Sequence, residues 1–186
     1  MIRDEFMRKL AKRHTLLVFL WVNFILADFL YVWVADFQLS FTKNPLMPGF
    51  SPMVRAALWI VAGAEIWLLH GFWKKRFLTK EALLPLLAMP KLPRALRDHA
   101  SPLEERCASV VSFYFIFKLA AFGLAASVAL CGFALAFWGH YVVDQYVLSF
   151  VSLALLVHEF PSKAFLQELV REVEIRGDPP QAVVKG

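Results

Sequence analysis

The residues from Val110 to Trp138 form the longest apolar run of the chain, VVSFYFIFKLAAFGLAASVALCGFALAFW, and Lys118 is its only formally charged residue. A helix of about 20 consecutive apolar residues is long enough to cross a lipid bilayer. We therefore predict a transmembrane helix here. This prediction constrains the rest of the chain, because in lipid only helices and closed barrels satisfy their own backbone hydrogen bonds.

One face of this predicted helix carries a small side chain at every third or fourth residue. Small residues let the backbone of a neighbouring helix approach closely. We therefore interpret the run as the central packing helix of a bundle that engages other membrane helices. The residues of this small-residue face are Ala121, Ala125, Ala129, Gly132 and Ala136.

Hydrophobic residues make up 59% of the 186 residues, and the excess over a typical soluble domain falls in four long runs. The predicted fold class is an all-α membrane protein, a bundle of four transmembrane helices in a single domain, 1–186. The predicted spans are 16–37, 53–73, 110–138 and 142–160, with a cytoplasmic loop at 74–109 and an amphipathic C-terminal helix at 161–176.

The distribution of Lys and Arg predicts the orientation. Basic residues cluster before the first span and between the second and third spans, whereas the other two loops hold few. By the positive-inside rule, both termini and the long loop face the cytoplasm, and we expect a multi-pass protein of a bacterial inner membrane. The net charge of +5 then favours attraction to anionic lipid over nucleic-acid binding.

The segment after the fourth span, PSKAFLQELVREVEIRG, has the pattern of an amphipathic helix, and Pro161 suits its first turn. We expect it to lie on the lipid headgroups or to dock on a cytoplasmic partner. Its apolar side is formed by Phe165, Leu166, Leu169, Val170 and Val173.

The ends of the second and fourth spans resemble each other. His70 and His158, Phe72 and Phe160, and three further pairs are separated by the same 88 positions. With two spans in each half, this spacing predicts two tandem helical hairpins. The further pairs are Lys75 and Lys163, Phe77 and Phe165, and Leu78 and Leu166.

The run LAASVALCGFALAFWG, followed by YVLSFVSLALLVHEFPSK, resembles the proteolipid c subunits of rotary ATP synthases, as their pattern recurs in four-span bacterial subunit-c-like proteins. That pattern, E-A-x-A-x-x-G, places an ion-carrying carboxylate six residues before a glycine. Ala129 and Gly132 match it, but Ala126 occupies the carboxylate position. The resemblance therefore implies a related hairpin architecture and argues against rotary ion carriage at that position.

Three ionisable residues lie well inside the predicted spans: Asp28, Glu65 and Lys118. With the inferred topology and about 1.5 Å per residue, they fall at similar depths in the membrane. A Lys flanked by two carboxylates is much cheaper to bury than any of the three alone. We interpret this intramembrane polar cluster as a buried ion pair that fixes helix register, with a proton or ion relay, or a Lys that extends to the lipid interface, as alternatives.

His70 and His158 both lie near the predicted cytoplasmic ends of their spans. Two imidazoles that meet across a bundle can ligate haem b, which gives a candidate ligand pair for a redox-complex anchor. The alternative is histidines beside the headgroups, with no cofactor bound.

The sequence shows no catalytic constellation, no metal-type Cys pair and no phosphate-binding Gly loop, so it does not predict an enzyme. The leading hypothesis is a structural or accessory subunit of a membrane complex. The expected partners are the lipid bilayer and other membrane subunits or further copies of the chain.

Overall fold

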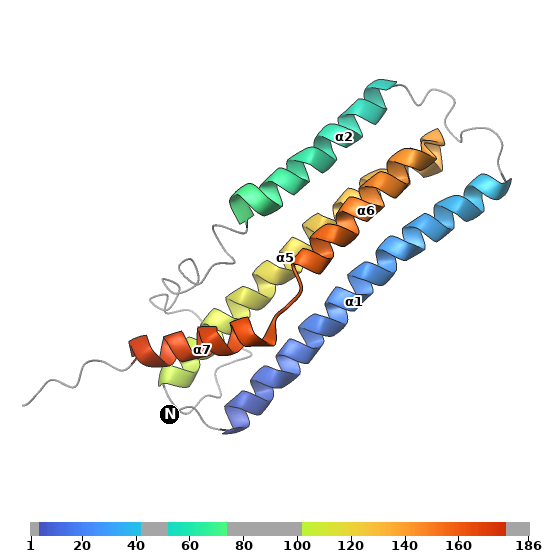
Figure 1. Cartoon of the computed structure of the whole chain (residues 1–186). Helices are drawn as coiled ribbons and strands as arrows, with labels where there is room; N and C mark the ends of the chain where they lie inside the picture. The colour runs from blue at the N-terminus through green and yellow to red at the C-terminus, as the bar shows by residue number, and fades with distance from the viewer. Residues whose placement is uncertain (1–3, 42–51, 74–101, 178–186) are drawn as a thin grey trace, which may run out of the picture.

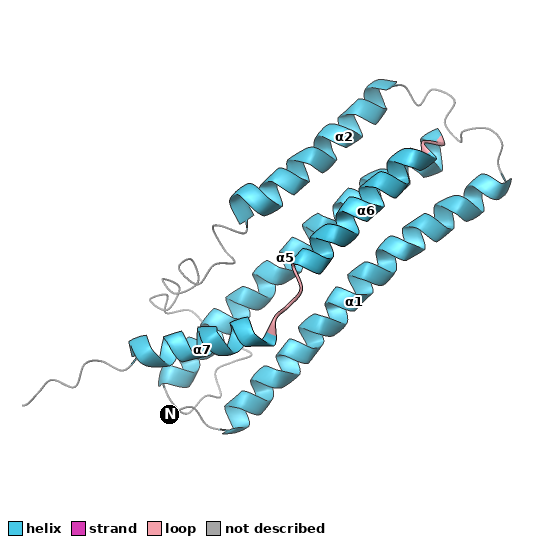
Figure 2. Ribbon diagram, in the orientation of Figure 1, coloured by secondary structure: helices cyan, strands magenta, loops and turns pink. Residues whose placement is uncertain are grey.

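The computed structural model describes residues 4–41, 52–73 and 102–177. In this part of the chain every regular element is a helix, and Figure 2 shows loops only around residues 140–141 and 159–162. The prediction of an all-helical protein is confirmed. The elements are α1 (Asp4–Phe41), α2 (Pro52–Trp67), the π-helix η1 (Leu68–Trp73), α5 (Pro102–Gly139), α6 (Val142–His158) and α7 (Lys163–Gly177).

Helix α5 is the central packing helix of the fold, as the sequence predicted. Helices α1, α2, α6 and α7 all pack against it (Figure 1). In its most apolar stretch 61% of the residues are buried inside the chain, against 11% for α1 and 11% for α2. The outer helices therefore present most of their apolar surface outward, which suits lipid far better than water.

Three of the described helices are long and apolar enough to cross a membrane: α1, α2 with the start of η1, and α5. Helix α6 has 17 residues and is short for a span. Together with α7, from which it is bent by 42°, it makes a fourth candidate. The chain thus has the helices of a membrane protein, while the four-span bundle remains a prediction.

The helices extend beyond the predicted spans, whose bounds in a membrane stay predictions. Helix α1 begins at Asp4, before the predicted span 16–37, and α5 begins at Pro102, before the predicted span 110–138, so residues 102–109 of the predicted loop are helical. Helix α7 begins at Lys163 because Ser162 occupies the position before it and its Oγ accepts a hydrogen bond from the Phe165 N–H at 3.5 Å. Residues 74–101 of the predicted loop lie outside the described part of the chain.

Helices α1 and α5 each have 38 residues, which corresponds to about 57 Å at the standard rise, nearly twice a bilayer core of about 30 Å. Their extra turns pack with α7 into a small bundle, here called the headpiece (residues 4–17, 102–117 and 163–177). The apolar side of α7 is therefore buried within the chain and is not open to headgroups or to a partner. Its buried residues are Leu166, Leu169, Val170 and Val173.

The second predicted hairpin is present, and the first is not. Helix α5 ends with His140 in the left-handed conformation (φ 59°). The His140 N–H then bonds Ala136 O at 3.0 Å and the Tyr141 N–H bonds Leu135 O at 3.1 Å, so that α6 folds back along α5. In contrast, α1 and α2 lie on opposite sides of α5 and α6 (Figure 1). The tandem-hairpin packing predicted from the repeat is therefore wrong for the first half.

Candidate functional site

The small-residue face of α5 receives α6. Ala121, Ala125, Ala129 and Ala136 are each 0% exposed. At Gly132 an added Cβ would lie 3.0 Å from Leu148 Cβ and 3.1 Å from Gln145 Cα. This close approach is what small residues permit. The face is thus used inside the chain, and a partner helix would need another surface.

Lys118 does not pair with the two carboxylates that the sequence suggested. Its Nζ lies 2.6 Å from Glu159 Oε2 and also donates to the Glu159 backbone carbonyl at 3.0 Å. The two side chains are 10% and 2% exposed, so the ion pair is buried. The predicted cluster of Asp28, Glu65 and Lys118 is therefore wrong as a single group, although a buried pair at Lys118 is present.

The Lys118–Glu159 pair stands where α6 breaks before α7, and two side chains of α1 contact backbone carbonyl groups near the same break. Trp21 Nε1 donates to Leu156 O at 2.7 Å, and His14 Nε2 contacts Pro161 O at 2.8 Å. A broken backbone at the end of a span is tolerated when its carbonyl groups find partners in the protein. Side chains of α1 and α5 therefore stabilise the break from two sides.

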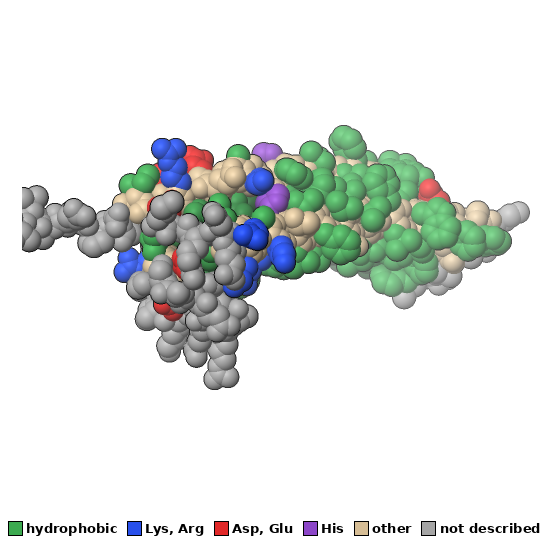
Figure 3. Space-filling view, turned by 90° about the horizontal axis from the view of Figure 1, so that it is seen from below, with side chains coloured by type: hydrophobic (Ala, Val, Ile, Leu, Met, Phe, Trp, Pro, Cys, Tyr) green, Lys and Arg blue, Asp and Glu red, His purple; other side chains and the backbone are tan. Residues whose placement is uncertain are grey.

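These contacts define one level of the bundle, here called the boundary layer: Trp21, His70, Lys118, His158 and Glu159. Helix α6 is about 25 Å long, so its end at His158 is close to one bilayer thickness from its start. Figure 3 agrees, since hydrophobic side chains cover the part of the molecule away from α7, Lys and Arg gather toward the α7 end, and His lies where they meet. Lys118 bonds Glu159 next to His158 and therefore lies close to the edge of this hydrophobic surface, here called the apolar zone; its depth in a membrane stays a prediction.

Asp28 and Glu65 lie inside that zone on different sides of α5. Ser152 Oγ of α6 donates to Asp28 Oδ2 at 2.6 Å, and Asp28 is 0% exposed. Glu65, on α2, is half-buried, and the nearby Ser127 hydroxyl of α5 donates to Leu124 O at 2.8 Å. In the described part of the chain, Asp28 Oδ1 and Glu65 Oε2 have no hydrogen-bond partner. Each carboxylate thus retains one oxygen that could accept a further donor.

His70 and His158 do meet. Their ring centroids are 5.4 Å apart and the rings are nearly parallel, with an interplanar angle of 17°. The π-helix η1 carries His70 to this point at the end of α2. Among the described residues no group of three or more His, Cys, Asp or Glu side chains is suited to a metal ion. Haem b at this pair remains a prediction.

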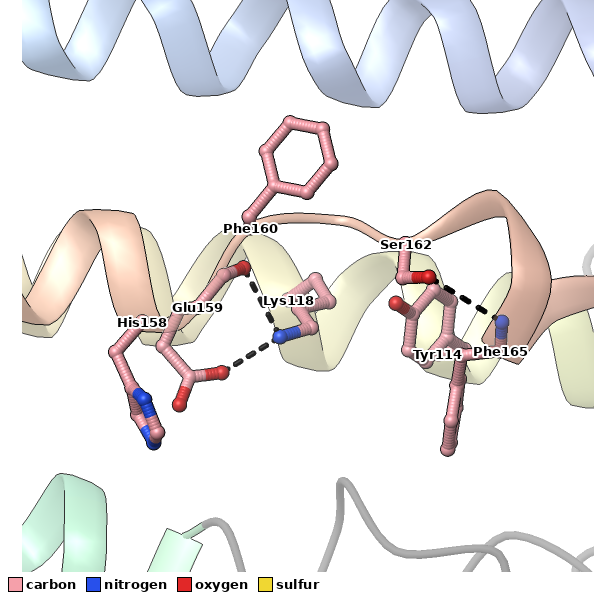
Figure 4. Close-up of a pocket in the computed structure, with 7 residues that line it drawn as sticks. All are labelled: Tyr114, Lys118, His158, Glu159, Phe160, Ser162 and Phe165. Atoms are coloured by element: carbon pink, nitrogen blue, oxygen red, sulfur yellow. Dashed lines mark hydrogen bonds and ion pairs between the residues drawn. The ribbon is translucent and has the colours of Figure 1, made fainter.

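Beside the ion pair lies a pocket of about 210 Å³ (Figure 4). Its polar walls come from α5, from the break between α6 and α7, and from the end of α6. Phe160 and Phe165 close its apolar sides. The polar residues that line it are Tyr114, Lys118, His158, Glu159 and Ser162.

The other end of the bundle carries a second ion pair. Arg55 of α2 donates to both Asp144 oxygens, from Nε at 2.6 Å and from Nη2 at 2.9 Å, and its guanidinium lies 4.8 Å from the centre of the Tyr141 ring. The Arg55 side chain is 47% exposed. This pair ties α2 to the start of α6, much as Lys118 ties α5 to its end.

Glu159 is the residue that sequence reasoning missed. It is a charged residue two positions before Pro161, and a proline at that distance is a usual sign that a helix stops. A carboxylate beside the predicted break could thus have been considered as a partner for Lys118. Only the folded chain shows that α5 and the end of α6 meet at this level.

Comparison of the chain with known protein families, with curated proteins and with solved structures gives no match. The fold by itself defines an all-helical protein with three or four helices suited to a membrane. The resemblance to proteolipid c subunits stays a prediction.

Proposed function

We propose that this protein is an integral-membrane accessory subunit whose helix α2 packs against a transmembrane helix of another protein. In this proposal it lies in a bacterial inner membrane, with both termini in the cytoplasm. The main observation in support is that α2 lies on one flank of the bundle and has a carboxylate, Glu65, part-way along its length.

Helix α2 has few neighbours among the described helices. It packs mainly against α5, and its buried residues in the described part are Ala62 and, in η1, Leu69. Helix α6, by comparison, lies against both α5 and α1. The other surfaces that the sequence assigned to partners, the small-residue face and the apolar side of α7, are already filled. Among the described helices, the α2 flank is one of the apolar surfaces that remain, beside the outer sides of α1 and α6.

Glu65 supports a protein neighbour over lipid alone on this flank. It lies about 8 Å along the helix from His70, inside the apolar zone. A carboxylate at this depth is costly in hydrocarbon unless donors satisfy it. Oε2 is buried in the chain and has no hydrogen-bond partner among the described residues. The side chain as a whole is half-buried, so a donor on a neighbouring helix could reach its exposed part.

Photo-crosslinking in native membranes tests this proposal. A benzophenone side chain replaces Ile60 on α2, and in a matched variant it replaces Phe150 on α6. Both positions are apolar and strongly exposed, at 71% and 73%. We expect a discrete protein adduct from position 60 and only lipid adducts from position 150.

The variant Glu65→Leu removes the carboxylate without leaving a buried charge unpaired. We expect about tenfold lower recovery of the crosslinked partner, since a hydrogen bond between membrane helices is worth about 1–2 kcal/mol. The chain itself should keep its stability in detergent, because an apolar replacement of a buried charge is often neutral. Lipid adducts alone from position 60 would contradict the proposal.

A second proposal is a proton or ion pathway. The observation that favours it is the available oxygen on each of Asp28 and Glu65, because ionisable groups inside a span are a common feature of proton relays. Lys118 was part of the predicted route, but its bond to Glu159 places it at the boundary layer. The pathway would therefore depend on the two carboxylates.

Proteoliposomes test this second proposal. If the chain conducts protons, Asp28→Asn and Glu65→Gln should each reduce the flux to that of empty liposomes, because an amide does not take up and release a proton in the same pH range. Ser127→Ala is the control, since it removes a neighbouring hydroxyl and no ionisable group. Unchanged flux in both amide variants would exclude this route.

A further inference from the structure

We propose that two copies of this chain associate side by side through the outward face of α1, with the Asn23 side chains of the two copies hydrogen-bonded to each other. The inference depends on membrane insertion of the helices and is independent of any partner on α2. It is supported by the residues on the outward face of α1 and by the open hydrogen-bonding groups of Asn23.

The outward face of α1 has the spacing of a coiled-coil seam. Helix α1 lies on one flank of the bundle (Figure 1), and its residues Asp28 and Ala35, both 0% exposed, face the neighbouring helices. On the opposite side, exposed residues recur at alternating intervals of three and four, which are the a and d positions of a heptad. We call this series the α1 seam: Leu16, Phe19, Asn23, Leu26, Leu30, Trp33 and Phe37.

The α1 seam is continuous and long. Its six apolar residues are each at least 50% exposed, and it extends over about 33 Å, close to the thickness of a bilayer core. A heptad series favours left-handed packing, which is the common arrangement of membrane helices. The next position toward the N-terminus is Lys12, whose long side chain can extend to the headgroups. A second helix could therefore pack along the whole apolar length of α1.

Asn23 distinguishes this face from one that is covered by lipid alone. It is exposed and lies about 10 Å along the helix from Leu16. One N–H of its Nδ2 donates to Phe19 O at 2.8 Å. The second N–H and Oδ1 have no partner among the described residues, and acyl chains offer neither donors nor acceptors. A polar group of a neighbouring helix would satisfy both.

A second copy of the chain supplies that group by symmetry. Copies inserted in one membrane have the same orientation, so two α1 helices related by a two-fold axis along the membrane normal are parallel. Each seam residue then meets its counterpart at the same depth. An amide both donates and accepts, so two Asn23 side chains complement each other. A single Asn at an a position is a known device for fixing register and oligomeric state.

Disulfide crosslinking of the full chain in native membranes tests the proposal. Leu30→Cys places a thiol on the α1 seam, and Phe150→Cys is the matched control on α6. The two positions lie at the same level, because Asp28 bonds Ser152 and α1 and α6 run in opposite directions. Both are exposed, at 53% and 73%, whereas the natural Cys107 and Cys131 are buried.

We expect oxidation to give a disulfide-linked dimer from position 30 and little or none from position 150. Opposing a positions of a parallel pair are close enough for a disulfide, which needs Cα atoms within about 7 Å of each other. No dimer from position 30, or equal yields from the two positions, would overturn the proposal. An adduct with a different protein at position 30 would overturn it as well.

A variant of Asn23 tests the hydrogen-bonded pair. In the Leu30→Cys protein, Asn23→Leu should lower the yield of dimer about tenfold, as loss of a hydrogen bond between membrane helices would give. Thr15→Val is the matched control, because it removes another exposed polar group of α1, which bonds Ala11 O and lies outside the α1 seam. It should crosslink as the Leu30→Cys protein does. An undiminished yield with Asn23→Leu would refute the assignment.

Discussion

Replacing Lys118 with Met is expected to lower the free energy of unfolding by about 3–5 kcal/mol, because it leaves the Glu159 carboxylate buried without its cation. The apolar stem of Met keeps the packing of the Lys chain, so the loss reports the charge. The Glu159 backbone carbonyl at the end of α6 also loses its donor. The measurement is denaturant or mixed-micelle unfolding of the purified protein in detergent.

Two further variants separate the buried pair from a general effect of breaking an ion pair. Lys118→Met with Glu159→Met removes both charges and should regain most of the lost stability. Asp144→Asn breaks the ion pair at the other end and leaves the Arg55 side chain, which is 47% exposed, without its carboxylate. It should cost at most about 1 kcal/mol, because an exposed guanidinium stays hydrated. Equal losses for Lys118→Met and Asp144→Asn would show that the Lys118 pair is not energetically buried.

Replacing Gly132 with Val is expected to cost about 1–3 kcal/mol of stability, since overpacking of a filled interface forces neighbours apart. The first atom of the new side chain would lie 3.0 Å from Leu148 Cβ and 3.1 Å from Gln145 Cα. A backbone atom of α6 cannot move aside as the tip of a side chain can. The α5–α6 contact should loosen, and thermal unfolding in detergent measures the change.

Gly123 provides the matched control on the same helix. An added Cβ at Gly123 meets nothing within 4 Å. Gly123→Val makes the same change in helix propensity as Gly132→Val, so the difference between the two variants isolates the packing of α6. Equal stabilities would mean that α6 does not depend on the small-residue face.

Sequence reasoning predicted the helical elements well because their signals are local. The apolar length of Val110–Trp138 and its small-residue face predicted a central helix, and α5 has that position. The spacing of α7 predicted its apolar side, but not what that side contacts. In the same way, the repeat predicted two hairpins, while α1 and α2 separate because each has more to bury against α5 than against the other.

The candidate site shows which features cannot be predicted from the local sequence. Counting residues from the predicted edge of a span does not find the partner of Lys118, because nothing in the sequence shows that α5 starts at Pro102 and meets the break after α6 at Lys118. The depth of a residue depends on where the neighbouring helices end. Here the end of α6 at His158, fixed by its contacts to Trp21 and Lys118, sets the level.

The sequence by itself determined that this chain is helical, that its long apolar runs suit a membrane and that Lys118 needs a buried partner. These properties follow from hydrophobic length, residue size and the cost of an unpaired charge, which each segment carries with it. Tertiary structure alone decided that the partner is Glu159, that α6 fills the small-residue face and that α7 folds onto α5. These contacts depend on which surfaces of the other helices can pack against a given face. The sequence of one segment does not contain that information.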